Sequence, residues 1–557
     1  MKLTDENNIQ YKSYRLNRKK HFILSIILRI LVFASSLSLS WLIVYKLANY
    51  NALISDLPSD WRLIVLFSFL MLLNIFTIDL FATFLMRFFL GLAFFLSFRK
   101  TKNKIRKIDV TSVADAKIAL LYPTKDDFSS EAVLESINQS YKNIHFFILD
   151  DSKKSKYISM IDSFIQQNQH LNITVIRREI KKGFKAGNIN NFLSLYKNQF
   201  DYYVWLDSDE KLCFDFVERC LQYFYYYSNL GIVQGNHKSD TPQTQFQNLL
   251  SRCIPWKLPI INEYYNFIGH SFLYGHGAMI SNETLSTMDF KIPEIVIEDI
   301  ATSIVAKSNK FQTIFASELV NTEEFPVSFN AFRVRQLKFV SGDHDLWFRV
   351  FIRKIGRHNN IFSMFQILSN ISLSNVLFLV FNLLILIFQI ISNVFSVASN
   401  IDLNFYFGFK YNIFIILLIT GSFIASLIPV FIHIAIVSKR KWLVPFQIIF
   451  YPVITFIMYT SLLVDCWIKA FITIFGIKAK FVTTPKTNEK ISFGKKILAN
   501  IIPISTLLII ATLLIVNFVF VHIISLYFIV YLTVTFVIPI IFRVLFSLLS
   551  NMKIKIN

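Results

Sequence analysis

Two carboxylates that follow an apolar segment are the first residues in this chain whose types and spacing could do chemistry. Residues 202–206 are aromatic and aliphatic, as in a buried strand, and Asp207 and Asp209 follow with one serine between them. Ligands of open α/β sheets bind just outside the carboxyl ends of the strands. An Asp-x-Asp pair there can hold a hard divalent cation, which can in turn hold a diphosphate. Because solvated turns often have the same spacing, this interpretation needs support from the rest of the chain.

Two earlier segments of the chain end in the same way. Residues 117–122 and 145–149 have the composition of buried strands, and they lead into the polar residues 123–127 and 150–151. Residues 185–190 contain a glycine and read as a turn that opens a helix. Any one acid could be a turn residue or a helix N-cap, where Asp is favoured. Several such sites in order predict carboxylates along one edge of a parallel sheet.

The composition indicates a membrane protein. The chain has 557 residues, of which 54% are hydrophobic and 59 are Phe, so we expect part of it to face lipid. Lys and Arg exceed Asp and Glu by 57 − 36 = 21. In a membrane protein this excess indicates cytoplasmic loops and anionic lipid headgroups rather than nucleic acid. The four cysteines have neither metal-ligand nor disulfide spacing, which suits a reducing compartment.

Residues 1–98 are predicted to be a cytoplasmic tail followed by two transmembrane helices. Basic residues precede an apolar run at 22–47, which places that end in the cytoplasm, and a second run at 63–98 returns. Both runs exceed the roughly 20 residues needed to cross a bilayer. Residues 99–348 carry frequent charges and alternate between strand-like and helix-like segments, which predicts a cytoplasmic α/β domain.

Residues 349–557 are predicted to hold interface helices and about four further transmembrane helices. The apolar segments lie near 371–397, 411–437, 497–519 and 524–548. The segment 443–476 either lies at the cytoplasmic interface, which gives six spans, or crosses, which gives seven. The interface position keeps the lysines of 478–496 cytoplasmic, as the positive-inside rule requires. We therefore expect a multi-pass protein of the plasma membrane with six spans.

These motifs resemble those of the family 2 glycosyltransferases, specifically the processive membrane synthases of cellulose and hyaluronan type. Residues 123–127 and 150–151 look like the two donor motifs, residues 185–190 match Lys-Ala-Gly-Asn-Leu-Asn, and residues 207–209 match the family's Asp-x-Asp. The resemblance implies a GT-A-like nucleotide-sugar-binding domain of the α/β class, inserted between α-helical transmembrane segments. It also implies a divalent cation, Mg²⁺ or Mn²⁺, held by Asp209 and Asp207. The implied donor-binding residues of this part are Thr124, Asp127, Asp151, Lys185, Asp207 and Asp209.

Two later segments resemble the acceptor and catalytic parts of the same family. The loop that ends at His276 looks like the acceptor-end loop, which implies acceptor contacts by Tyr274 and His276. Residues 297–303 resemble Thr-Glu-Asp followed by Thr-Ser, and lack only the first Thr. The resemblance implies that Asp299 is the general base and that Glu298 positions it. Such a base suits inverting transfer, because one carboxylate must take the proton of the acceptor hydroxyl.

Residues 335–339 depart from the family's Gln-x-x-Arg-Trp, since Arg335, Lys338 and Phe339 stand at the motif positions. Arg and Lys can still bind phosphates, although Lys lacks the bidentate fork. Phe can stack on a sugar ring without the N–H donor of Trp. The resemblance therefore implies donor contacts by Arg335 and Lys338 and an acceptor contact by Phe339, and the departure leaves the product class open.

Residues 481–486 resemble the gating loop of bacterial cellulose synthase. The resemblance implies a cytoplasmic lid near 478–495, in which Thr484 and Lys486 contact the donor and exclude water from it. The alternative is an ordinary basic loop on the membrane surface.

The function implied by the resemblance is that of a processive, inverting, metal-dependent glycosyltransferase. It would polymerise a sugar from a UDP-sugar, by default UDP-glucose with a β-glucan-like product, and move the polysaccharide through its own spans. A non-processive enzyme that acts on a polyprenyl phosphate is the alternative, and a nucleotide-sensing transporter is a less favoured one. The expected partners are the UDP-sugar, the growing polysaccharide and membrane lipids, and not nucleic acid.

Overall fold

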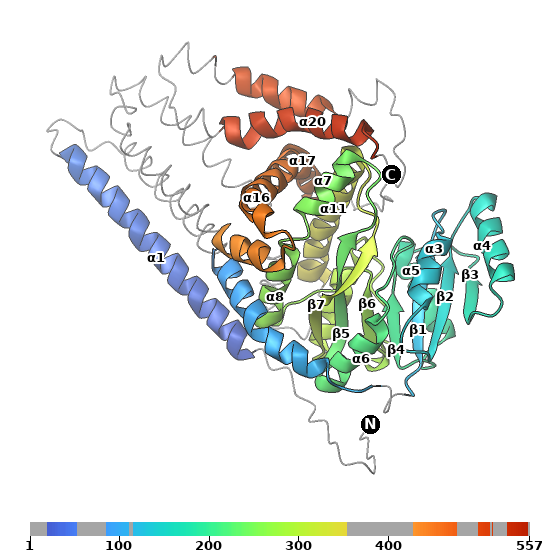
Figure 1. The fold of residues 1–557 in the computed structure, drawn as a ribbon. Coiled ribbons are helices and arrows are strands. Elements are labelled where there is room, and N and C mark those ends of the chain that lie inside the picture. The colour runs from blue at the N-terminus through green and yellow to red at the C-terminus, as the bar shows by residue number, and fades with distance from the viewer. Residues whose placement is uncertain are drawn as a thin grey trace.

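The structure is a computed structural model, and it describes residues 19–52, 85–110, 115–353, 427–475, 500–512, 515 and 532–554. A seven-stranded mixed sheet with the order β3-β2-β1-β4-β6-β5-β7 forms its centre (Figure 1). Strands β3, β2, β1 and β4 are parallel, and β6 runs antiparallel to both of its neighbours. The strands are β1 (Ile118–Thr124), β2 (Ile144–Asp150), β3 (Ile173–Arg177), β4 (Tyr202–Trp205), β5 (Leu230–Ser239), β6 (Ala278–Ser281) and β7 (Gln312–Glu323).

The three strands predicted from the sequence are confirmed as β1, β2 and β4, within one or two residues at each end. Their register aligns Thr124 of β1 with Asp150 of β2, and Leu121 of β1 with Trp205 of β4. The segments that follow these strands therefore leave the same edge of the sheet. The sheet as a whole is mixed, because β6 enters between β4 and β5.

Both faces of the sheet are buried, since alternate residues of each strand join different cores. Leu120 of β1 packs in one core with α3, α4 and α6, whereas Leu121 packs in the other with α5 and α9. The α/β class predicted from the sequence is confirmed by this layered arrangement. The helices of the domain are α3 (Ser130–Ile137), α4 (Ser155–Gln167), α5 (Phe184–Leu195), α6 (Phe216–Tyr226), α7 (Gln245–Cys253), α8 (Leu258–Ile268), α9 (Asn282–Ser286), α10 (Glu298–Ser308) and α11 (Phe329–Arg353).

Helices from both ends of the chain pack on this domain. The predicted run 22–47 falls within helix α1 (Lys19–Ala52), whose Ser25 Oγ lies 3.3 Å from the Tyr264 hydroxyl of α8. Helices α16, α17 and α20 lie near α7 and α11 (Figure 1). The C-terminal helices with printed bounds are α16 (Val444–Thr460), α17 (Leu463–Ile474) and α20 (Ile538–Asn551).

One helix among the described residues, Lys441–Thr460, is long and apolar enough to cross a membrane. Shorter apolar helices are Leu427–Val437, Asn500–Thr512 and Ile538–Asn551. The segment 443–476, predicted to lie at the interface, forms two helices, α16 and α17, with a break after Thr460. The other predicted spans fall wholly or partly outside the described residues, so the number of spans stays a prediction.

A buried lysine connects the helical residues 85–105 to the domain. Lys102 Nζ lies 2.5 Å from Glu263 Oε1 of α8 and 3.2 Å from Glu318 Oε2 of β7. Burial lowers the pKa of this ammonium, but the two carboxylates together outweigh burial and raise it above its ordinary value. Because the side chain of Glu263 is fully buried, its negative charge depends on this partner.

We predict that Lys102→Met destabilises the folded protein by about 3 kcal/mol, since removing one member of a buried ion pair leaves an uncompensated charge. The midpoint of thermal unfolding in detergent would measure the loss. Lys104→Met, on the exposed side of the same helix, is the matched control and should leave the midpoint unchanged. Equal midpoints for the two variants would contradict the prediction.

Candidate active site

A lysine from the first turn of α5 neutralises the charge of Asp207, the first acid after β4. Lys185 Nζ forms an ion pair with Asp207 Oδ1 and donates to the carbonyl of Gly275 at 2.8 Å. Burial lowers the pKa of Lys185, but Asp207 and further acids together raise it above its ordinary value. Burial opposes the charge of Asp207 as well, yet Lys185 and His276 hold the pKa of this carboxyl well below its usual range. Both groups are therefore charged at neutral pH.

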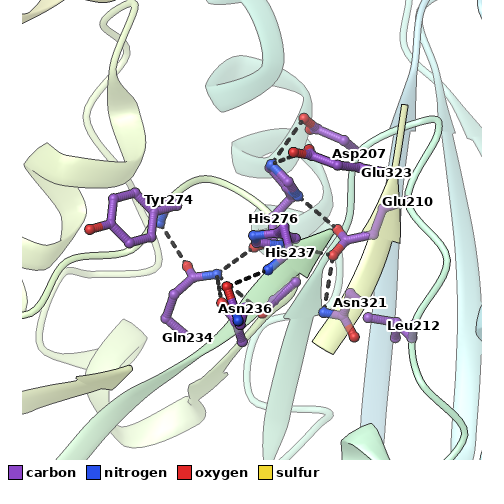
Figure 2. A network of polar contacts seen from close by, with 12 residues as sticks. Asp207, Glu210, Leu212, Gln234, Asn236, His237, Tyr274, His276, Asn321 and Glu323 are labelled. Atoms are coloured by element: carbon purple, nitrogen blue, oxygen red, sulfur yellow. Dashed lines mark hydrogen bonds and ion pairs between the residues drawn. The ribbon is translucent and has the colours of Figure 1, made fainter. Parts of the chain in front are cut away.

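His276 lies between carboxylates on both sides of its ring (Figure 2). Its Nδ1 is 3.1 Å from Glu210 Oε2, and its Nε2 is 3.2 Å from Glu323 Oε2 and 3.9 Å from Asp207 Oδ2. Because a carboxylate only accepts hydrogen bonds, each ring nitrogen must donate, and the imidazole is protonated. Burial alone would lower the pKa of His276, but Glu210 and the other acids raise it to about 10.

Glu210 is the buried centre of this cluster. Its Oε1 lies 3.1 Å from His237 Nε2 of β5 and accepts a hydrogen bond of 3.1 Å from Asn321 Nδ2 of β7. Neither Glu210 nor His237 was among the site residues predicted from the sequence. Glu210 directly follows the Asp-x-Asp pair, which was the available signal, whereas a single histidine among the polar residues 236–239 gives none.

Two sets of side chains here have the chemistry of metal ligands. Glu210, His237 and His276 have possible ligand atoms that all lie within 4.8 Å of one another, and a cation such as Zn²⁺ or Mn²⁺ could bind them once His276 has lost a proton. The predicted pair, Asp207 and Asp209, offers oxygen atoms alone, which suit Mg²⁺ or Mn²⁺. The side chain of Asp207 is 41% exposed, so it can be reached from solvent.

The loop through His276 requires glycine on both sides of the histidine. Gly275 and Gly277 have φ values of +90° and +57°, a region that other residues rarely adopt. A Cβ on Gly275 would lie 3.1 Å from Asp299 Oδ2, and one on Gly277 would collide with Glu210 and His237. The backbone of this loop therefore separates the acids after β4 from those of α10.

The predicted base and its neighbour begin helix α10. Asp299 Oδ1 accepts a hydrogen bond of 2.8 Å from the backbone N–H of Ile300. Burial raises the pKa of both Glu298 and Asp299, and the negative charge of Asp299 raises that of Glu298 further. Lys338 of α11 lies near enough for its charge to lower the pKa of Asp299 and of Asp207. The charge of Lys338 therefore acts on both groups of acids.

Asp343, one turn beyond Phe339 on α11, was not foreseen from the sequence. Burial and the charge of Asp299 raise the pKa of Asp343 well above its ordinary value. The side chain of Phe339 is 42% exposed, so it is accessible to a ligand.

The predicted contacts to the nucleoside already have partners within the protein. Asp127 Oδ1 accepts from the Thr124 hydroxyl at 2.8 Å, and its Oδ2 accepts from the Ser208 hydroxyl at 2.6 Å. Asp151 binds Arg178 through two hydrogen bonds of 2.9 and 2.6 Å. Arg178 also donates to the carbonyl of Lys182 at 2.6 Å, so this ion pair fixes the loop before α5. Asp127 thus joins the loops after β1 and β4.

The other predicted site residues lie at different places. The Tyr274 hydroxyl bonds to Asn262, so its ring points away from His276 (Figure 2). The guanidinium of Arg335 lies over the rings of Phe325 and Phe332, each with its centre 5.8 Å away. Thr484, Lys486 and the predicted lid at 478–495 lie outside the described residues.

Comparisons with known proteins show which proteins this domain is similar to. Residues 130–288 match the model of glycosyl transferase family 2. The chain is 29% identical to an uncharacterized glycosyltransferase of Haemophilus influenzae over 20% of this chain and 42% of that protein. It is 22% identical to glucomannan 4-beta-mannosyltransferase 2 of Arabidopsis thaliana over 38% of this chain and 41% of that protein. The matches thus span less than half the length of either relative.

Two solved structures were also found to be similar. One is the mannosyltransferase PcManGT from Pyrobaculum calidifontis in complex with GDP-Man and Mn²⁺, with a TM-score of 0.39 and 13% identity over 69% of this chain and 96% of that one. The other is GalNAc-T7 with UDP, GalNAc and Mn²⁺, with a TM-score of 0.29 and 9% identity over 38% and 43% of the two chains. Residues 130–288 of this chain are therefore similar to the glycosyl transferase family 2 model, and the curated relatives that match are named as glycosyltransferases.

Proposed function

We propose that this protein is an inverting, metal-dependent glycosyltransferase of the membrane, which extends a polysaccharide from a nucleotide-sugar donor and moves it through its own spans. One series of contacts carries the proposal. Asp207 binds Lys185, Lys185 binds the carbonyl of Gly275, and Gly275 lies against Asp299. A diphosphate site and a base are thereby held on two sides of one loop, as transfer between a donor and an acceptor requires.

In the proposed reaction, Asp299 takes the proton of the acceptor hydroxyl while the oxygen attacks the anomeric carbon of the donor. The bond from that carbon to the diphosphate breaks, and the nucleoside diphosphate leaves with the electron pair. Glu298 keeps Asp299 in place, and Lys338 faces both Asp299 and the acids after β4. A divalent cation on Asp209 and Asp207 would neutralise the charge that develops on the leaving group.

The remaining predicted roles belong to the same proposal. Thr124, Asp127, Asp151 and Arg335 would lie around the donor, directly or through the partners described above, and Thr484 and Lys486 would close over it. Tyr274, His276 and Phe339 would bound the acceptor. We propose domain limits of 1–98, 99–348 and 349–557, with the catalytic domain on the cytoplasmic side of the plasma membrane.

UDP-glucose remains the proposed donor, and the relatives make GDP-mannose the first alternative to test. One relative is named as a mannosyltransferase and one similar structure holds GDP-Man. The test is nucleoside diphosphate release by the purified full chain with Mn²⁺ and each of UDP-glucose, UDP-galactose, UDP-N-acetylglucosamine and GDP-mannose. A long saccharide product supports the proposal. A short lipid-soluble product would instead support transfer to a polyprenyl phosphate, and no release with any donor would overturn the transferase assignment.

We predict that Asp299→Asn lowers the transfer rate by about 10²- to 10⁴-fold and leaves donor binding unchanged, because only the proton acceptor is lost. Product formation and nucleoside diphosphate binding would be measured on the same preparation. Asp115→Asn, an exposed acid at the opposite ends of the strands, is the control and should retain full rate. Normal synthesis by Asp299→Asn would show that another group is the base.

We predict that the transfer rate is lost on acidification at a higher pH than it would be if the base had the ordinary pKa of a carboxyl group. Burial raises the folded-state pKa of Asp299, and the base works only when it is ionised, so activity is lost as pH falls through this raised value. Lys338→Met should move the acid limb of kcat/KM to still higher pH, because the charge of Lys338 lowers that pKa. A limb that stays in place in this variant would contradict the prediction.

Metal activation tests which donor set is used. We predict that chelation abolishes transfer and that Asp209→Ala requires at least about tenfold more Mn²⁺ for half-maximal rate, because a ligand is lost. His237→Gln, in the neighbouring histidine group, should leave the Mn²⁺ requirement unchanged. The reverse pattern would assign the cation to Glu210, His237 and His276 instead.

A further inference from the structure

Outside the candidate active site, a buried carboxylate joins three helices. Asp465 of α17 has a side chain that is only 2% exposed, and it lies between one arginine of α11 and one of α20. Arg333 places Nε at 2.8 Å and Nη2 at 2.7 Å from Asp465 Oδ1. Arg543 places Nη1 at 2.7 Å from Asp465 Oδ2. None of the three residues was among the site residues predicted from the sequence.

The two arginines have further partners that fix their positions. Arg543 also donates to the carbonyl of Ser461 at 3.3 Å, and its guanidinium lies 5.6 Å from the ring centre of Phe329, at the start of α11. Phe329 packs in turn against Phe546 of α20. Removing these three charged groups from water costs free energy. The best-attested use of such a buried ionic group is to specify one arrangement of the helices that it joins.

The position of Arg333 on α11 relates this ionic group to the active site. Lys338 lies five residues further along the helix, and five residues turn an α-helix by about 140° beyond one full revolution. Arg333 therefore contacts α17 through Asp465, whereas Lys338 lies on another side of α11, where its charge interacts with those of Asp207, Glu298 and Asp299. The ion pair of Arg333 with Asp465 fixes the rotation of α11 about its own axis. It thereby also fixes the direction in which Lys338 leaves the helix.

We propose that Asp465 is a positioning residue for sugar transfer, which acts through Arg333 to keep Lys338 directed at the reacting groups. The inference rests on the proposed function, and it extends that function by making the membrane-proximal helices α17 and α20 part of the catalytic arrangement. Loss of the ionic contact turns or loosens α11 without removing any group that touches the donor.

The experiment combines Asp465→Asn and Arg333→Gln, singly, with Lys338→Met. Each of the first two variants should lower kcat by about ten- to a hundredfold with donor KM nearly unchanged, because small displacements of a positioned group have effects of this size. In the Lys338→Met background the same substitutions should cost less than about twofold, since their effect passes through the missing side chain. Arg333→Gln leaves Asp465 paired with Arg543 and is the milder change.

Asp162→Asn is the matched control. It breaks an arginine pair of the same length, 2.7 Å to Arg177, at an acid that is 49% exposed, and it should leave kcat unchanged. Losses that simply add to that of Lys338→Met would overturn the proposal, because they would show that Asp465 does not act through Lys338.

Hydrogen exchange gives a readout that does not depend on activity. Asp465→Asn should speed amide exchange in residues 334–341 of α11 and leave residues 298–308 of α10 unchanged. Unchanged exchange in α11 would overturn the proposal even if the purified chain transferred no sugar. The failure of the proposed function and the failure of this inference are thus distinguishable.

Discussion

The arrangement of the candidate site depends on the charge balance of Asp207 and Glu210. Glu210 is fully buried, and a carboxylate in that position is stable as an anion only beside a cation or several hydrogen-bond donors. Lys185 supplies the positive charge for Asp207, and His276 supplies it for Glu210. Because these cations come from α5 and from the loop before β6, the balance can form only after distant parts of the chain have met.

The same requirement explains the glycines of the loop before β6. His276 can reach Glu210, Glu323 and Asp207 together only if its backbone comes very close to the acids. Gly277 leaves no room for a Cβ beside Glu210, and Gly275 leaves little beside Asp299. The close approach also brings the carbonyl of Gly275 to Lys185. One short loop thereby contacts both groups of acids.

The sequence predicted those parts of the fold that are written in local patterns. Strands β1, β2 and β4 are apolar runs that end in polar residues, so the strands and the shared edge at their ends could be read directly. The antiparallel strand β6 could not, because its four residues, Ala278–Ser281, are not followed by a pair of acids as β4 is. The contacts of Glu210, His237, Arg178 and Asp465 could not be foreseen for a different reason. Each acquires its partner only through tertiary contacts, which a single sequence does not display.

Helix α11 shows how a departure from a family motif can be accommodated. The guanidinium of Arg335 lies over the rings of Phe325 and Phe332, so it contributes to packing beside Lys338. Lys338 is then the residue of this segment whose charge acts on Asp207, Glu298 and Asp299 together. A single ammonium offers no bidentate fork, so its effect depends on where the helix holds it. The ionic contact of Arg333 with Asp465 supplies that constraint from α17.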